Sequence, residues 1–459
     1  MPDNSLGKIF KITVFGESHG KIIGVVVDGA PAGLKLNEEI VQAELDKRKP
    51  GFSDISTTRI EEDKVQIYSG VFNGFTTGAP ICMMIENKNV RSVDYEEFKT
   101  KPRPGHADLT ARIKYGGFND YRGGGQFSGR ITASFVMAGA IAKQLLASKK
   151  INVLAYTYQI AGETAEIKGN LDEIKTNRDN NPVYCPDKEA SERMIKKILE
   201  AKSEGDSVGG IVQCMVTGLP AGVGEPVFSS VESEISKALF SIPGVKGVEF
   251  GSGFKSASMK GSEHNDYFKY DENGWIITET NNAGGILGGL TTGMPVIFNV
   301  AFKPTASISK EQRTVDLENK METTIKIKGR HDPCIVPRAV PVVEAVTAIV
   351  IVDLLMQAGY FSQLIAADKK DLQYQRNMIE EITFKILELF KQRLDAAEII
   401  AKIKSERDKS IRDVERERAL ISKAISYAEK IGLPKEYADS LVKELIRLTV
   451  KLEEETVKK

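Results

Sequence analysis

The chain has 459 residues, of which 41% are hydrophobic and 27% charged, and its 63 basic side chains balance its 63 acidic ones. This length predicts two or three globular domains, and the neutral balance argues against nucleic-acid binding, so anionic ligands must be met by local groups of Arg and Lys. Four scattered cysteines, Cys82, Cys185, Cys214 and Cys334, fit neither a zinc site nor a disulfide framework. The chain opens on a polar segment without a secretory leader, and its longest apolar run, 345–352, is too short to cross a bilayer. We therefore expect a cytoplasmic protein without a membrane partner.

Short strands and helices alternate over the first 360 residues. We expect strands at 9–15, 22–27, 65–71, 79–86, 209–217 and 294–302, and helices at 38–48, 133–148, 191–205, 228–241 and 339–356. Few of these units have the length of a βαβ crossover. The pattern favours an antiparallel or mixed sheet with helices on a face over a doubly wound sheet.

The composition changes after about residue 370. From there to the end the chain has one Gly and one Pro, within 432–434, and is dense in Lys, Glu, Leu and Ile. Apolar residues recur at helical spacing on both sides of this break. The change predicts a first domain at 1–360, a linker at 361–370 and an all-helical domain at 371–459.

Polar chemistry in the first domain is concentrated in loops shaped by Gly and Pro. They read GESHG (16–20), RPGHAD (103–108), YRGGGQFSGR (121–130), KPTAS (303–307) and KGRHDPCIVPRAVPVVE (328–344). Three of the four histidines, His19, His106 and His331, lie in them, and no pair has metal-ligand spacing, so acid/base or anion-binding work is favoured over metal binding. The triple glycine would let backbone N–H groups approach a phosphate. The prolines of 328–344 predict a shaped connector instead of a helix or central strand.

From the residues alone, the first domain reads as an enzyme that binds a polyanionic substrate and a phosphorylated cofactor. Each loop taken singly also fits a solvated surface turn. The loops together, with the AGGILGG segment at 283–289, closely resemble chorismate synthase, in order, over residues 1 to about 358. That family removes phosphate and a ring hydrogen from 5-enolpyruvylshikimate 3-phosphate in a 1,4-elimination that needs reduced FMN without net redox change. The resemblance implies an α+β chain whose first domain is a β-α-β sandwich, usually tetrameric.

The resemblance also implies roles for individual residues. His19 and His106 would form the acid/base pair, with Asp332 and Ser18 assisting near the flavin. Substrate anions would be held by Arg103, Arg130 and Arg338, with Arg48 serving the substrate or the cofactor. Flavin contacts would come from Gln126, Phe127, Ser128, Pro243, Gly244, Gly288, Lys303, Pro304, Thr305, Ala306, Ser307 and Arg330. Many members have Arg-Ser-Ser where this chain has residues 126–128, and Arg in place of Asp54. It therefore stays open whether this enzyme reduces its own flavin with NADPH.

The helical domain carries a second pattern, R376…R393…K404…D413xxR416E417…T449xxxE453. Arg393 and Lys404 fall on one helix face, whereas Arg376 lies roughly 25 Å along the helix from Arg393 and points elsewhere, so it would serve a partner's site. The pattern resembles the all-helical class of chorismate mutase over 371–455, an intertwined three-helix dimer that rearranges chorismate to prephenate.

This second resemblance implies a cationic pocket. Arg393 and Arg376 would hold the carboxylates, Lys404 and Glu453 the ether oxygen, and Asp413 and Glu417 the hydroxyl, with Arg416 and Thr449 assisting. Many bacterial members have Gln at position 453, so Glu453 must be protonated to donate a hydrogen bond there. We therefore expect mutase activity to fall as pH rises.

The two resemblances together predict a bifunctional enzyme that makes chorismate and then consumes it. We expect a homotetramer with a dimeric mutase part, small-molecule substrates and no bound metal. Two alternatives remain at this point. In the first, the C-terminal helices only assemble the protein, and the first domain is an active synthase. In the second, the first domain binds flavin without catalysis, but this alternative leaves its loop histidines unexplained.

Overall fold

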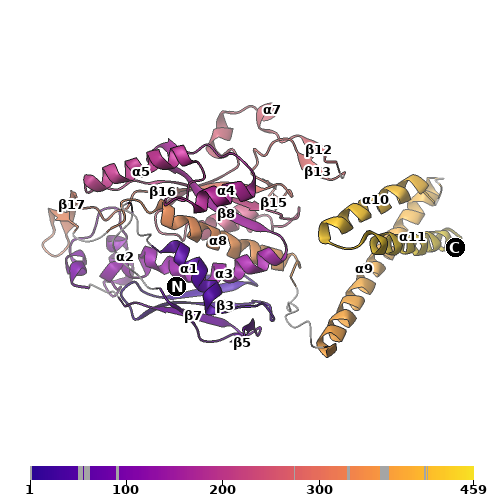
Figure 1. The fold of residues 1–459 in the computed structure, drawn as a ribbon, viewed down its shortest axis with the longest axis horizontal. Helices are drawn as coiled ribbons and strands as arrows, with labels where there is room; N and C mark the ends of the chain where they lie inside the picture. Colours follow the sequence, from indigo (N-terminus) through magenta and orange to yellow (C-terminus); the bar gives the residue numbers. More distant parts are fainter. Residues whose placement is uncertain are drawn as a thin grey trace. The chain divides into compact units, whose positions relative to one another are not determined.

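A computed structural model describes residues 3–49, 55, 63–88, 92–272, 274–327, 331–361, 372–407, 410 and 412–458. The described chain forms two compact units (Figure 1). The larger unit contains residues 1–267 and 278–367, and the helical unit contains 368–459 together with 268–277. The predicted linker at 361–370 lies outside the described residues from 362 onward.

The larger unit is built on two five-stranded sheets whose neighbouring strands all run antiparallel. The first has the order β1 (Ser5–Leu6), β2 (Lys11–Gly16), β3 (Ile22–Asp28), β7 (Ile81–Glu86), β4 (Val65–Ile67). The second has the order β11 (Val245–Phe250), β16 (Val296–Phe302), β10 (Gly210–Thr217), β8 (Asn152–Ile160), β9 (Glu163–Thr164). Alternate residues of β7 and β16 are fully buried, as expected for strands with one face on a core.

Three helices lie between the two sheets: α1 (Glu38–Arg48), α3 (Thr132–Ser148) and α8 (Val336–Gln357) (Figure 1). α3 packs on β3 of the first sheet, and α8 packs on β8 and β10 of the second. α3 and α8 can approach closely because Gly139 has no side chain. A Cβ at this position would lie only 2.3 Å from the Cβ of Ala345. The layers therefore form the expected β-α-β sandwich, with its apolar core around α3 and α8.

The remaining elements of the larger unit cover the outside or shape loops. α6 (Val231–Leu239) packs against α8, and α5 (Lys188–Ser203) packs against β8 and β9. The others are β5 (Val71–Phe72), β6 (Phe75–Thr76), α2 (Asp108–Tyr115), α4 (Leu171–Asp179), α7 (Gly261–His264), β14 (Ile286–Leu287), β15 (Leu290–Thr291), β17 (Glu311–Asp316) and β18 (Met321–Lys326). Short 3-10 turns lie at Ser92–Lys99, Arg122–Phe127, Gly129–Ile131 and Gly253–Ser258.

The expectation that prolines would keep 328–344 out of a helix is wrong. α8 begins at Val336, with Pro337 in its first turn, where a missing backbone N–H costs nothing, and it continues through Pro341. α8 is buried along almost its whole length, and this packing offsets the hydrogen bond that Pro341 cannot donate. The described part of the segment starts at His331, and Arg330 lies outside it.

Two apolar helices are longer than the run 345–352, which by itself is too short to cross a bilayer. Among the described residues, Gly129–Ser148 and Val336–Gln357 are long and apolar enough to cross a membrane. The apolar window of α8 is entirely buried inside the fold, and that of α3 is mostly buried. Their hydrophobicity is thus accounted for by the core of the sandwich.

The helical unit contains α9 (Leu372–Glu406), α10 (Val414–Ile431) and α11 (Lys435–Lys458), and its segment 268–277 forms β12 (Phe268–Tyr270) and most of β13 (Ile276–Thr278). Asp413 caps α10, because its carboxylate accepts the backbone N–H of Arg416 at 2.9 Å. Gly432 ends α10 in the left-handed conformation with φ 75°, which favours glycine. α11 then returns to pack on both α9 and α10.

Candidate active sites

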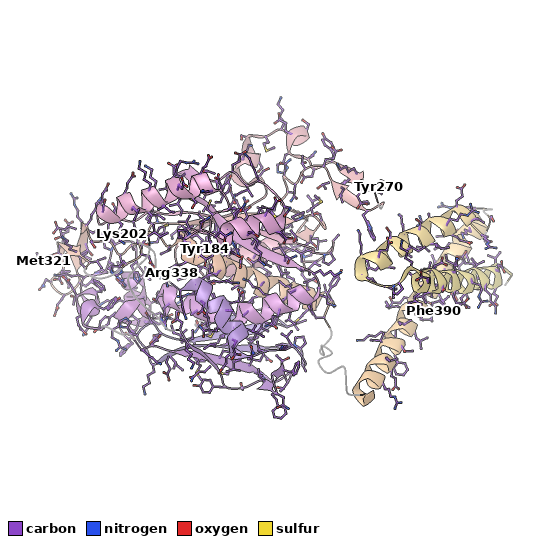
Figure 2. The ribbon with its side chains drawn as sticks, viewed as in Figure 1. Tyr184, Lys202, Tyr270, Met321, Arg338 and Phe390 are labelled. Carbon is purple, nitrogen blue, oxygen red and sulfur yellow. The ribbon has the colours of Figure 1, made fainter. Side chains whose placement is uncertain are left out.

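A cavity of about 750 Å³ opens in the larger unit beside the start of α8. Its walls come from segments far apart in the chain, and most of them are loops that follow a strand or precede a helix. They include Ser18, Tyr95, 103 with 105–107, 126–130, 240–246, 302–307 and parts of 331–342. Arg338, which is labelled in Figure 2, contributes from the first turn of α8.

The triple glycine passes between two histidines. Gly123, Gly124 and Gly125 all have positive φ, between 53° and 84°. A Cβ on Gly123 would lie 2.4 Å from the ring of His19, and one on Gly124 would lie 3.1 Å from the ring of His106. These glycines are therefore needed both for the backbone turn and for the space between the two imidazoles.

His106 is held by a carboxylate and a guanidinium. Its Nδ1 lies 2.6 Å from Asp108 Oδ1, which makes Nδ1–H the donor and leaves Nε2 as the basic nitrogen. Arg103 donates to Asp108 through Nε at 2.7 Å and Nη2 at 2.8 Å, and its Nη2 lies 3.1 Å from His106 Nδ1 and 3.2 Å from Nε2. Burial alone would raise the pKa of Asp108, but the hydrogen bonds and charges of Arg103 and His106 outweigh it and hold that pKa well below its usual range. Asp108 is thus a carboxylate that orients the imidazole.

A second acidic group, Asp332, borders the cavity itself. Asp332 accepts a hydrogen bond from Arg338 Nη1 at 2.5 Å, and the Nε of Arg338 donates to the backbone carbonyl of Arg48 at 3.2 Å. The backbone carbonyl of Asp332 accepts from the hydroxyl of Thr305 at 3.1 Å. This chain of bonds ties the start of α8 to the end of α1 and to the KPTAS loop.

The KPTAS loop supplies a cation and hydroxyls to a cavity that also has apolar lining residues. Lys303, Thr305 and Ser307 border the cavity, with Ile242 and Phe302 among its apolar residues. Burial, and then the neighbouring charge of Lys246, lower the pKa of Lys303. The loop fits a phosphorylated, flat cofactor because it combines anion donors with a surface for an aromatic ring.

Most of the residues implied by the first resemblance border this one cavity. They are Ser18, Arg48, Arg103, His106, Gln126, Phe127, Ser128, Arg130, Pro243, Gly244, Lys303, Pro304, Thr305, Ala306, Ser307, Asp332 and Arg338. His19 lies directly behind the wall, 7% exposed, with its ring edge-on to Tyr95 at 4.8 Å. Arg330 and Asp54 lie outside the described residues.

Gly288 is not among the residues that border the cavity. It lies in the turn between β14 and β15, where the carbonyl of Gly289 accepts the N–H of Val231, the first residue of α6. The cavity is bordered instead by residues 240–246, which follow the other end of α6. The predicted cofactor contact at Gly288 therefore lies outside the lining of this cavity.

Sequence reasoning missed two charged residues here, Asp63 and Lys246. Asp63 is buried between Arg48 and Arg130, and Lys246 borders the cavity near Lys303. Asp63 is 15 positions from Arg48 and 67 from Arg130, so no local spacing could reveal their contact. Lys246 sits in an ordinary strand pattern, without a motif that marks it.

The second candidate site lies between α9 and α11. Arg393 Nε donates to Thr449 Oγ1 at 3.2 Å, and Lys404 Nζ donates to Glu453 Oε2 at 2.8 Å. Thr449 and Glu453 are 9% and 6% exposed. The predicted shared face of Arg393 and Lys404 therefore meets the face that carries Thr449 and Glu453.

The other residues of the second pattern are more exposed. Arg376 is exposed near the start of α9, and Arg416 is exposed in the first turn of α10. Asp413 caps α10, and Glu417 lies in the first turn of that helix. Glu417 accepts from Arg412 Nε at 3.2 Å, a partner that sequence reasoning did not select.

The fold and the two sites define a two-part enzyme for anionic small molecules, with acid/base groups in the first part and paired cations in the second. Comparison with known families divides the chain into the same two parts. Residues 10–356 match the family model described as Chorismate synthase, and residues 375–454 match that described as Chorismate mutase type II. The chain belongs to the chorismate synthase family and carries a chorismate mutase type II domain at its C-terminus.

Similar proteins support this assignment. A chorismate synthase of Dehalococcoides mccartyi is 54% identical over 362 residues, which cover 79% of this chain and 99% of that protein. One of Korarchaeum cryptofilum is 53% identical over 358 residues, which cover 78% and 99%. A crystal structure of chorismate synthase aligns with a TM-score of 0.62 at 27% identity and covers 82% of this chain and 99% of that one. The chain is thus a bifunctional enzyme that depends on reduced flavin, forms chorismate and rearranges it.

Proposed function

We propose that the cavity of the larger unit binds FMN together with 5-enolpyruvylshikimate 3-phosphate. Its volume of about 750 Å³ lies in the upper part of the range for ligand pockets, roughly 300–1,000 Å³. The residues fit the cofactor: Lys303, Thr305 and Ser307 would meet its phosphate, and Ile242 and Phe302 would meet its ring. When bound, the reduced flavin supplies reducing equivalents that are returned within each turnover.

In this proposal the arginines of the cavity hold the anionic groups of the substrate. Four arginines border it: Arg48, Arg103, Arg130 and Arg338. A dianionic phosphate leaves more readily when guanidinium groups already face the developing charge. The same arginines fix the ring relative to the histidines, which lowers the entropic part of the barrier.

His106 and His19 handle protons in this proposal. Asp108 fixes the tautomer of His106, so that Nε2 can accept a proton and, once the ring is an imidazolium, give that proton to the leaving phosphate. His19, with Ser18 beside it, lies on the other side of the triple glycine. Asp332, held by Arg338, assists removal of the ring proton. NADPH as the reductant, and a cytoplasmic location, are parts of the same proposal.

For the helical unit we propose that Arg393 and Lys404 bind chorismate between α9 and α11. Lys404 would donate to the ether oxygen, where negative charge develops in the transition state, and Glu453 would share that contact when it is protonated. Thr449 positions Arg393 through the 3.2 Å bond. Asp413, Glu417 and Arg416 would meet the hydroxyl end of the substrate.

Exposed apolar side chains on the first half of α9 favour a dimer for this unit. Ile379, Ile382, Ile386 and Leu389 are 47–65% exposed. α11 packs against the later half of α9, near Arg393 and Lys404, and in Figures 1 and 2 the earlier half of α9 extends beyond α10 and α11. Such an apolar stripe is typical of an interface, and a second copy laid along it would bring its own Arg376 to this site. A tetramer would then join two such pairs.

The observation that carries the whole proposal is the convergence of His106, Asp108, Arg103 and the KPTAS loop on one cavity. Full-length protein with reduced FMN and 5-enolpyruvylshikimate 3-phosphate should release phosphate and yield prephenate. The Arg393→Ala variant should release phosphate at the unchanged rate but accumulate chorismate. Absence of phosphate release would contradict the synthase assignment, and continued prephenate formation by Arg393→Ala would contradict the mutase site and favour a tail that only assembles the protein.

A further inference from the structure

We propose that Asp63 is a positioning residue that locks Arg48 and Arg130 into a single subsite for an anionic group of the substrate. The inference deepens the proposed function and rests on it. Asp63 does not itself border the cavity, whereas both arginines do. It acts through them.

The carboxylate of Asp63 bridges the two guanidinium groups. Its Oδ1 accepts from Arg130 Nη1 at 2.5 Å, and its Oδ2 lies 3.4 Å from Arg48 Nη1. The side chain of Asp63 is 0% exposed, and those of Arg48 and Arg130 are 4% and 7% exposed. Two cations buried this close would repel one another, and the carboxylate between them offsets that repulsion.

The backbone around Asp63 is fixed by a helix of the central layer. Gln42 on α1 donates from its Nε2 to the carbonyl of Asp63 at 3.0 Å and accepts the N–H of Val65 at 3.0 Å. Asp63 has φ 42°, a left-handed conformation that Asp tolerates better than most residues. A residue held in such a conformation by neighbouring bonds points to a specific requirement for its side chain.

Other N–H groups of both guanidinium groups also donate hydrogen bonds to nearby protein oxygens. Arg48 donates from Nε to Thr132 Oγ1 at 2.9 Å and from Nη2 to the carbonyl of Gly129 at 3.0 Å. Arg130 donates from Nε to Asn87 Oδ1 at 2.9 Å. Asp63 therefore joins the two guanidinium planes to each other beside the cavity. Two guanidinium groups held in a fixed geometry suit an incoming carboxylate or phosphate.

The test compares Asp63→Asn with a matched control, Asp353→Asn, in full-length protein. Asp353 is also buried, accepts backbone N–H groups of Ile9 and Phe10 at 2.7 and 2.9 Å, and is not among the cavity residues. Loss of the charged hydrogen bonds should raise the KM for 5-enolpyruvylshikimate 3-phosphate about tenfold in Asp63→Asn, with kcat and FMN affinity within about twofold. Inorganic phosphate, titrated against FMN-loaded protein by flavin fluorescence, should bind about tenfold more weakly as well.

Unchanged KM and phosphate affinity in Asp63→Asn would overturn the inference, and so would an equal loss in Asp353→Asn, which would indicate general loosening. If Asp63→Asn does not fold, Asp63→Glu keeps the charge and displaces it by one methylene. A selective rise in its KM supports the inference, and an unchanged KM refutes it. Phosphate release by the wild type, measured first, tests the proposed function separately.

Discussion

Glu344 is predicted to stabilise the sandwich by joining its layers through a buried ion network. It lies on α8, 3% exposed, and accepts hydrogen bonds from Lys143 of α3 and Arg178 of α4 and from the N–H of Ala155 in β8 at 2.9 Å. Lys143 also pairs with Glu44 of α1 at 2.7 Å. The substitution Glu344→Gln keeps the shape but removes the charge that these two cations face.

The magnitude follows from the pKa of this carboxyl. Burial alone would raise the pKa of Glu344, but Lys143 and Arg178 lower it from 4.5 to about 2. A shift of that size corresponds to about 3 kcal/mol, and removal of one partner of a buried pair typically costs about 3–5 kcal/mol. For a unit of about 360 residues, with unfolding entropy of roughly 2.1 cal/mol/K per residue, this lowers Tm by about 4 °C.

The pH dependence gives the sign of the effect. Because the folded pKa is depressed, the stabilisation from Glu344 is complete above pH about 4.5 and is lost as pH falls towards about 2. Thermal scans of wild type and Glu344→Gln should therefore differ by a constant amount from pH 6 to 8 and converge in acid. Glu166→Gln, which breaks the exposed pair with Lys168, is the control and should leave Tm unchanged. Equal Tm values for wild type and Glu344→Gln at pH 7 would refute this reasoning.

Two further predictions concern the active sites. His106→Ala should keep FMN affinity but lower phosphate release by about 10²–10⁴-fold, because the imidazole oriented by Asp108 is removed; retained turnover would support a site without acid/base work at His106. Wild-type mutase activity should fall from pH 5 to 8, whereas Glu453→Gln should show a flat profile, since an amide donates a hydrogen bond at any pH. A flat wild-type profile, or loss of prephenate formation in Glu453→Gln, would contradict a donating role for this residue.

The sequence by itself determined the two families and the chemistry of their loops. Motifs such as RPGHAD keep His106, Asp108 and Arg103 within six positions, so local backbone geometry brings them together. The shared helical face of Arg393 and Lys404 could also be predicted, because helix periodicity alone sets which side chains share a face. The change of composition near residue 370 likewise predicted a boundary there, and α9 begins at Leu372.

Only the tertiary structure decided which distant charges meet. Asp63 reaches Arg130 across 67 positions, and Glu344 reaches Arg178 across 166, through packing that no local pattern records. Tertiary packing also overrode a local rule at Pro341, because burial of α8 between two sheets outweighs one missing hydrogen bond. The physical reason is common to these cases: spacing along the chain fixes contacts within a loop or helix turn, whereas contacts between layers depend on how whole sheets and helices pack.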